Sequence, residues 1–234
     1  MSRGRASLLE PRPEVLLFDF GGTLDSDGEP WKERFYRIWS EEAGELPRAR
    51  FDPAFHDADD ELVGTVSRRL SLSETIDRLS RGVSARLNTG AAAAGRVAGR
   101  FTDETRGTLG RRSGFLESLS ASYRLGIVSN FYGNLQSVCD ETGIGPFFSI
   151  SIDSADVGCS KPAPAIFEAA LGALEVGASD AVFVGDSIPR DMAGAKGVGM
   201  RHVLLRPDGP PEAPLCCPDD AVIRRLEDLS GILP

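Results

Sequence analysis

Polar residues that could do chemistry follow apolar segments along this sequence: Asp19, Ser129, Asn130, Lys161, Asp186 and Asp191. Asp19 could serve as a nucleophile, because a carboxylate can form a covalent intermediate. Together with Asp19, the carboxylates of Asp186 and Asp191 offer the oxygen ligands that a hard cation such as Mg²⁺ prefers. Ser129 provides a hydroxyl donor and Lys161 a positive charge, and both suit a phosphoryl group. These residue types together indicate metal-assisted phosphate chemistry.

The segment Val15–Leu24 determines where Asp19 lies. Its apolar start, Val15–Phe18, predicts a buried parallel strand that ends at the Asp19 carboxylate. Gly21 and Gly22 then permit a tight turn, close approach of the backbone to a ligand, and N–H groups that can face an anion. Ligands of open parallel sheets bind beyond the carboxyl ends of the strands. We therefore expect this turn to form part of a ligand site.

Beyond residue 114, helical patterns alternate with short apolar segments, which is typical of a parallel α/β sheet. The predicted strands are Arg124–Ser129, Phe147–Ile152, Ala181–Val184 and His202–Leu205. The predicted helices are Leu135–Thr142, Pro164–Leu174 and Arg190–Gly197, and Phe115–Ser120 is expected to be the end of a helix. The fold class is therefore predicted to be α/β, with Asp19 at the end of a central strand.

Residues 25–109 lack the alternation of a strand and instead show helical spacing of apolar residues. Helices are predicted over Pro30–Ala43, Pro53–Leu70, Ser71–Leu87 and Ala91–Leu109. Ser71 and Glu74 form a capping box at the start of the third helix. Aromatic residues such as Trp31 recur at helical spacing, which favours core packing over ligand contact. This region is predicted to be a helical insertion.

Composition excludes several classes of protein. The formal net charge of -9 argues against nonspecific binding to nucleic acid or to an anionic membrane. No apolar segment approaches the length of a membrane span, and residues 1–13 are polar and broken by prolines, so we expect a cytoplasmic protein. The cysteines lack the spacing of a metal site or a disulfide framework and are interpreted as ordinary thiols: Cys139, Cys159, Cys216 and Cys217. No feature specifies an oligomeric state.

Four motifs occur in the order known from the haloacid dehalogenase (HAD) superfamily. They are Asp19-Phe20-Gly21-Gly22-Thr23-Leu24, Val128-Ser129-Asn130, Ser160-Lys161-Pro162-Ala163-Pro164 and Val184-Gly185-Asp186-Ser187 through Asp191. The chain thus resembles phosphatase-type HAD-like hydrolases with an α-helical C1 cap. The resemblance implies a three-layer, Rossmann-like core with a parallel sheet, formed by residues 1–24 and 110–234. It also implies that residues 25–109 form the cap.

The resemblance further implies Mg²⁺-dependent hydrolysis of a small phosphorylated metabolite through an aspartyl-phosphate intermediate. The implied catalytic residues are the nucleophile Asp19, with Ser129 and Lys161. The implied phosphate ligands are Gly22, Ser129, Asn130 and Lys161. The implied Mg²⁺ ligands are Asp19, the Gly21 carbonyl, Asp186 and Asp191, the last of which could instead support Lys161.

Gly21 departs from the phosphatase pattern, which usually carries a second aspartate at this place as general acid and base. Such assistance is typically worth about 10² to 10⁴ in rate. The substrate could have a good leaving group, as acyl and anomeric sugar phosphates do. Alternatively Asp25, or a cap cluster whose members are otherwise expected to be solvated, could replace the carboxylate: His56, Asp57, Asp59 and Asp60.

Two other functions remain open. One is hydrolysis of a carbon bond, as in HAD-type dehalogenases and phosphonatases, which replace the second aspartate with other residues. A phosphonatase also needs a cap lysine, and Lys32 is the only lysine of the predicted cap. The other is a phosphate-ligand binding protein without turnover, although such a protein has no need for a nucleophile at Asp19.

Overall fold

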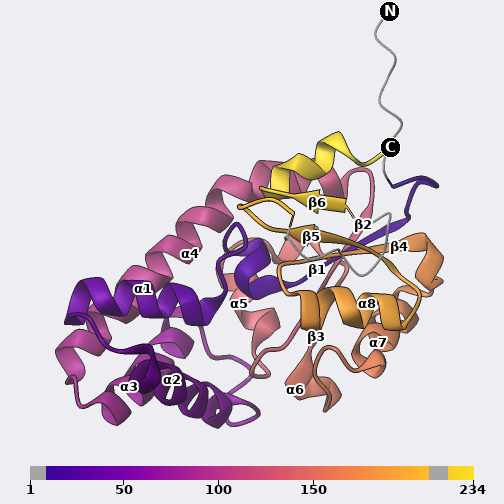
Figure 1. The fold of residues 1–234 in the computed structure, drawn as a ribbon. Helices are drawn as coiled ribbons and strands as arrows, with labels where there is room; N and C mark the ends of the chain where they lie inside the picture. Colours follow the sequence, from indigo (N-terminus) through magenta and orange to yellow (C-terminus); the bar gives the residue numbers. More distant parts are fainter. Residues whose placement is uncertain (1–8, 211–220) are drawn as a thin grey trace, which may run out of the picture.

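The computed structural model describes residues 9–210 and 221–234, so Cys216 and Cys217 lie outside the described residues. The strands are β1 (Val15–Phe18), β2 (Arg124–Ser129), β3 (Ile150–Asp153), β4 (Ala181–Gly185), β5 (Arg201–Leu205) and β6 (Ala221–Ile223) (Figure 1). The helices are α1 (Trp31–Ala43), α2 (Arg48–Leu62), α3 (Leu72–Leu87), α4 (Ala91–Ser120), α5 (Leu135–Glu141), α6 (Ser154–Val157), α7 (Pro164–Leu174) and α8 (Ala193–Gly197).

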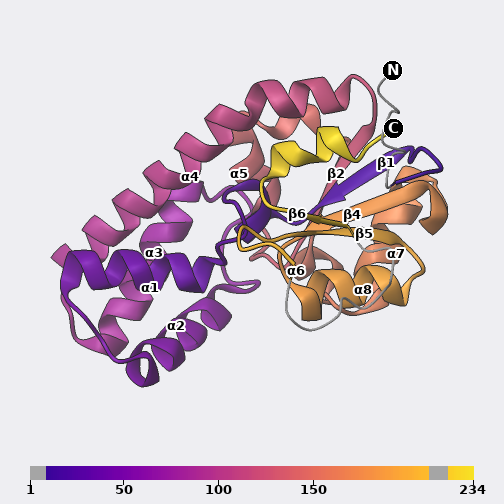
Figure 2. The same cartoon turned by 45° about the horizontal axis from the view of Figure 1, so that its top comes forward.

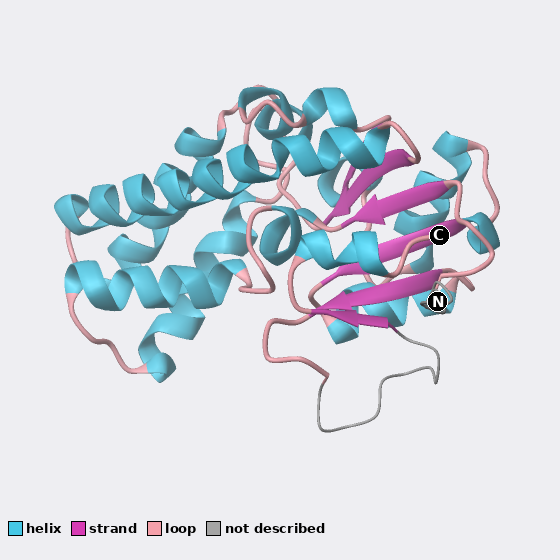
Figure 3. Ribbon diagram, turned by 90° about the horizontal axis from the view of Figure 1, so that it is seen from above, coloured by secondary structure: helices cyan, strands magenta, loops and turns pink. Residues whose placement is uncertain are grey.

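The strands form one parallel sheet in the order β3-β2-β1-β4-β5-β6. β1 lies between β2 and β4, and all four of its residues are buried, as a continuous apolar run in a parallel sheet requires. Figure 3 shows the carboxyl ends of the strands directed toward the helical part of the molecule. The predicted α/β class with Asp19 following a central strand is confirmed.

Two apolar clusters cover the two faces of the sheet. Leu16 and Phe18 of β1 pack with residues of α4 and α5, whereas Val15 and Leu17 pack with residues of α7 and α8. The alternation follows from the pleat of a strand, which directs successive side chains to opposite faces. Full burial of each of these side chains contributes roughly 1.5–3 kcal/mol. Helices on both faces give the predicted three layers.

Helices α1 to α3 and the first half of α4 pack together beyond the carboxyl edge of the sheet (Figure 2). Helix α3 begins with the predicted capping box, in which Ser71 accepts from the Glu74 N–H and Glu74 accepts from the Ser71 N–H. Its apolar face is buried: Ile76, Leu79, Val83 and Leu87. None of the helices in the described ranges is long and apolar enough to cross a membrane.

Helix α4 differs from the prediction, because one helix covers Ala91–Ser120, whereas a helix over Ala91–Leu109 and a separate helix end at Phe115–Ser120 were expected. Each interior glycine costs about 1 kcal/mol relative to alanine. Buried side chains along the whole helix outweigh that cost, with Phe101 packed against α1 and Leu116 against the sheet layer. The boundary expected after residue 109 therefore falls inside a continuous helix, and the division into core and cap stays a prediction.

Other predicted boundaries also differ from the structure, and α8 begins at Ala193 rather than at Arg190 because the turn Ile188–Met192 precedes it. Helix α2 begins at Arg48 and ends at Leu62, rather than covering Pro53–Leu70. Pro53 lies inside it, and buried Phe51 and Phe55 pack on neighbouring aromatic rings, which favours the earlier start. Strand β3 begins at Ile150, because a short 3-10 turn occupies the three residues Gly145–Phe147. Boundaries of helices and strands shift in this way when tertiary packing outweighs the local preference of the residues.

Candidate active site

The loops at the carboxyl edge of the sheet meet at one cavity of about 500 Å³. Asp19 follows β1, Ser129 ends β2, and Lys161 lies in the loop before α7. Asp186 follows β4, and Asp191 lies in the turn Ile188–Met192. The structure therefore brings these five predicted residues together, although they come from distant parts of the chain.

Asp19 accepts from two donors. Ser129 Oγ lies 2.9 Å from Asp19 Oδ1, and Lys161 Nζ lies 2.6 Å from the same oxygen. Lys161 Nζ also lies 2.7 Å from Asp191 Oδ1. Lys161 is 4% exposed and Asp19 7% exposed, so this pairing is largely screened from bulk water. Burial lowers the pKa of Lys161, but the neighbouring carboxylates outweigh burial and raise it, so the lysine remains charged.

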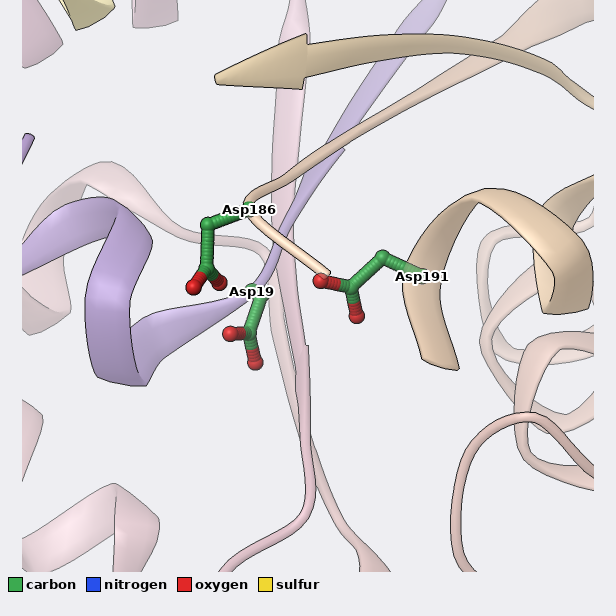
Figure 4. A group of neighbouring side chains, drawn as sticks. All are labelled: Asp19, Asp186 and Asp191. Atoms are coloured by element: carbon green, nitrogen blue, oxygen red, sulfur yellow. The ribbon is translucent and has the colours of Figure 1, made fainter. Parts of the chain in front are cut away.

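Asp19, Asp186 and Asp191 form a carboxylate cluster whose oxygens lie within 4.8 Å of one another (Figure 4). Burial, followed by the charges of Asp19 and Asp191, raises the pKa of Asp186 to about 8. Burial also raises the pKa of Asp191, with Lys161 acting in the opposite direction. One lysine thus faces three carboxyl groups, so the cluster carries excess negative charge once Asp186 ionises. Hard oxygen donors with unbalanced charge fit a divalent cation such as Mg²⁺.

Two glycines make room for this cluster. Gly22 has a φ of +96°, and a Cβ there would lie 2.6 Å from Asp186 Oδ2. A Cβ at Gly185 would lie 2.4 Å from Asp191 Oδ2. Atoms cannot approach so closely, so a side chain at either position would displace a carboxylate. The glycines of the first and last motifs are thus required by the closeness of the acids.

Gly22 and Asn130 have partners that differ from the predicted phosphate contacts. The Gly22 N–H donates to Asp25 Oδ1 at 2.8 Å. The Asn130 amide donates to the Lys161 carbonyl at 3.2 Å and accepts from the Lys161 N–H at 2.7 Å. The carboxamide of Asn130 therefore fixes the backbone that carries Lys161. Both residues thus hold the loops in this structure, and their contact with phosphate stays a prediction.

The space beside Gly21 is occupied by Trp31. A Cβ at Gly21 would lie 3.1 Å from Trp31 Nε1. The indole nitrogen donates to Asp25 Oδ2 at 2.7 Å, and Arg34 also binds this oxygen. Asp25 is fully buried and does not line the cavity, so the structure argues against Asp25 as a replacement acid. Trp31 packs against the apolar core, as its helical spacing favours, and it also lines the cavity.

Arg112 of α4 holds the turn after Asp19 by hydrogen bonds to its backbone. Its Nη1 donates to three carbonyl oxygens at 2.7–2.8 Å, those of Thr23, Leu24 and Ser26. The residue is 2% exposed, and its guanidinium also pairs with Asp27. Satisfying several carbonyls with one buried cation rigidifies the turn. Nothing in its sequence context distinguishes Arg112 from the other arginines of α4, so sequence reasoning missed it.

Besides the strand-end loops, the start of α1, helix α2 and the segment after β2 line the cavity. Tyr132 and Phe131 directly follow Asn130, and their place after a strand end is a signal that could have identified them. The Tyr132 hydroxyl donates to Asp59 Oδ1, and Asp59 lines the cavity. Asp57 and Asp60 are exposed, as expected for solvated residues of this cluster. Helical spacing alone did not reveal that Asp59 differs from them.

The crowding of the three carboxyl groups leads us to predict how the unfolding temperature depends on pH. The pKa of Asp186 is raised in the folded protein, so its contribution to stability is present below the unfolded pKa near 4 and is lost as the pH rises through about 8. We expect Asp186→Asn to raise the unfolding temperature of the metal-free protein at about pH 9 more than at about pH 6. Mg²⁺ should stabilise the wild type and should stabilise the variant much less.

Thermal scans of both proteins, with Mg²⁺ and with a chelator, measure these differences. Asp57→Asn is the matched control, because Asp57 is exposed and does not line the cavity. An undiminished Mg²⁺-dependent shift in Asp186→Asn would show that the ion binds elsewhere.

Comparison with known proteins identifies relatives and a shared fold. The family model of haloacid dehalogenase-like hydrolases matches residues 13–199, which is more than half of the chain. Haloacid dehalogenase-like hydrolase domain-containing protein 3 of Danio rerio is 34% identical over 108 residues, 46% of this chain and 45% of that protein. Glyceraldehyde 3-phosphate phosphatase of Pyrococcus abyssi is 37% identical over 100 residues, 42% of this chain and 41% of that protein.

The matched part spans less than half the length of both relatives. A crystal structure of a dehalogenase with an intermediate complex superposes with a TM-score of 0.66 at 19% identity, covering 95% of this chain and 97% of that one. At this identity the likeness shows the fold alone.

Proposed function

The chain belongs to the haloacid dehalogenase-like hydrolase family, and on this basis we propose that it is a Mg²⁺-dependent phosphatase of a small phosphorylated metabolite. One observation carries the proposal. The Asp19 carboxylate lies in a cavity between two donors, Ser129 Oγ and Lys161 Nζ, with two further carboxylates beside it. A nucleophile, neutralising donors and cation ligands are the parts that phosphoryl transfer needs.

In the proposed reaction an Asp19 oxygen attacks phosphorus, and the bond from phosphorus to the leaving oxygen breaks. Water then attacks the aspartyl phosphate, which releases inorganic phosphate and restores the carboxylate. Ser129 and Lys161 already reach Asp19 Oδ1, so they are placed to contact the oxygens of the group that is transferred there. Positive charge at this point stabilises the transition state, in which charge spreads over the equatorial oxygens.

The proposed Mg²⁺ ligands are Asp19, Asp186 and Asp191, with the carbonyl of Gly21, which also lines the cavity. When bound, the ion would neutralise phosphate charge and offset the repulsion among the carboxylates. Asp191 also pairs with Lys161, so it positions the lysine whether or not it coordinates the ion directly.

The substrate proposal draws on the cavity and on a relative. A cavity of about 500 Å³ suits a small molecule. The Pyrococcus abyssi relative is a glyceraldehyde 3-phosphate phosphatase, which supports a phosphorylated metabolite as substrate here. We further propose that the helices between residues 25 and 109 act as a cap over the site, and that the protein works in the cytoplasm on free metabolites.

A substrate panel tests the proposed function. The panel contains acetyl phosphate, a sugar 1-phosphate, glyceraldehyde 3-phosphate and 4-nitrophenyl phosphate, each assayed for phosphate release with Mg²⁺ and with a chelator. We expect Mg²⁺-dependent release from at least one ester, because Lys161 and a bound Mg²⁺ would together neutralise the charge of the transferred phosphoryl group.

Metal-independent halide release from 2-chloropropionate would instead assign carbon-bond hydrolysis. Borohydride trapping of phosphonoacetaldehyde on Lys32 would assign a phosphonatase, since Lys32 lines the cavity. Tight binding of beryllium fluoride without turnover of any ester would favour a binding protein.

A further inference from the structure

We propose that Asp59 of α2, held by the Tyr132 hydroxyl, gives the leaving oxygen the proton that Gly21 cannot supply. The inference rests on the proposed phosphatase activity and assigns the acid that the Asp19 turn lacks. It makes the second catalytic carboxylate a residue of the helical region instead of a residue of the strand-end turn.

Asp59 lines the same cavity as Asp19 but comes from a helix outside the sheet. Asp19, Ser129 and Lys161 form one wall of the cavity, and residues of α2 line the same cavity. In phosphoryl transfer the leaving oxygen lies roughly in line with the attacking oxygen, on the far side of phosphorus. The leaving group of a phosphoryl group at Asp19 must therefore extend away from Asp19 into the rest of the cavity, which α1 and α2 both line, and Asp59 is one of these lining residues.

The other acids near the cavity are already engaged. Asp25 is fully buried behind Trp31, outside the cavity lining. Glu33 lines the cavity but pairs with Arg48, and its side chain is 41% exposed. Among the described residues that line the cavity from the helical region, Asp59 is thus the carboxyl group whose partner is a neutral hydroxyl.

The surroundings of Asp59 suit a carboxyl group that carries a proton. Burial is the main cause of its raised pKa, and Asp60 acts in the same direction. The Tyr132 hydroxyl, His56 and Arg190 act in the opposite direction but do not cancel the effect of burial. Because the Tyr132 hydroxyl donates to Oδ1, we place the proton of Asp59 on its other oxygen, Oδ2. A general acid works best when its pKa lies nearer the working pH than that of a free carboxyl.

The proposed proton transfers balance over the two steps. When the Asp19 oxygen attacks, the electron pair of the breaking P–O bond goes to the leaving oxygen, which takes the proton of Asp59. In the second step the Asp59 carboxylate takes a proton from water as the water oxygen attacks phosphorus. The electron pair of the P–O bond to Asp19 returns to its carboxylate, and Asp59 is again protonated.

Asp59→Asn tests the assignment, since the amide still accepts from Tyr132 but cannot provide an acidic proton. The assay compares kcat/KM for glycerol phosphate, a poor leaving group, with that for 4-nitrophenyl phosphate, a good one. We expect a loss of about 10²-fold or more on glycerol phosphate and little loss on the aryl ester, because nitrophenolate leaves without a proton. Asp57→Asn, the same change on the exposed side of α2, should leave both values unchanged.

Each alternative result has a definite meaning. An equal loss on both esters, or no loss on either, overturns the role of Asp59 while the phosphatase stands. A selective loss on glycerol phosphate in His56→Gln but not in Asp59→Asn gives the role to the neighbouring histidine, which also lines the cavity. If the wild-type protein hydrolyses no phosphate ester, the proposed function fails and the inference falls with it.

Discussion

Replacement of Asp19 by asparagine is expected to lower kcat for every ester that the protein hydrolyses by roughly 10⁴-fold or more. The amide cannot form the aspartyl phosphate, and it also removes one ligand of the proposed cation. The geometry of the pocket should survive, because the amide oxygen can still accept from Ser129 Oγ and Lys161 Nζ. Steady-state assays with the best ester of the substrate panel measure the loss.

Circular dichroism and thermal scans of Asp19→Asn separate a chemical effect from unfolding. Asp57→Asn again provides a matched control with the same change at an exposed position. An Asp19→Asn protein that is folded and keeps a tenth or more of the wild-type turnover would contradict the assignment of the nucleophile.

Replacement of Lys161 by methionine is expected to destabilise the metal-free protein by about 3–5 kcal/mol, the usual cost of removing one partner of a buried ion pair. Lys161 is 4% exposed and pairs with both Asp19 and Asp191 at 2.6–2.7 Å, so its loss leaves buried carboxylates without their cation. Denaturant unfolding measures the change. Mg²⁺ should restore part of the lost stability, whereas turnover should remain low because phosphate loses a charged donor.

Lys32→Met is the matched control for this substitution. Lys32 lines the same cavity, but its side chain is 29% exposed and lies 3.8 and 3.9 Å from its two carboxylate partners. Exposed pairs of this kind contribute only about 0–1 kcal/mol. Equal destabilisation by the two substitutions would contradict the special role of Lys161. The double variant Lys161→Met/Asp191→Asn should recover part of the loss, because it removes one of the unpaired carboxylates.

The sequence alone predicted the parallel sheet and which residues meet at the carboxyl ends of its strands. A continuous apolar run such as Val15–Phe18 is stable only between other strands, and polar residues after such runs must gather at one edge of a parallel sheet. That reasoning needs only the order of strands and their common direction. It correctly placed Asp19, Lys161 and Asp186 together without any knowledge of the distances between them.

Local sequence could not determine the helical side of the site. A helical pattern shows which face of α2 is apolar, but the neighbours of Asp59 depend on how α2 packs against Tyr132, 73 residues away in the chain. The same holds for Arg112, which reaches the turn after Asp19 across more than 80 residues. Local propensities carry no information about such contacts, since they arise from packing after the elements have formed.

Gly21 shows most clearly what the sequence predicts and what only the tertiary structure reveals. The sequence determined that the position beside the nucleophile has no carboxylate. The tertiary structure shows what occupies the space instead, because the Trp31 indole lies against Gly21 and is held there by its hydrogen bond to buried Asp25. The replacement that we propose, Asp59, also depends on tertiary structure, because it lies on one of the two helices that line the cavity and that the strand pattern does not position. Chemistry at strand ends follows from sequence order, whereas chemistry across a cavity follows from packing.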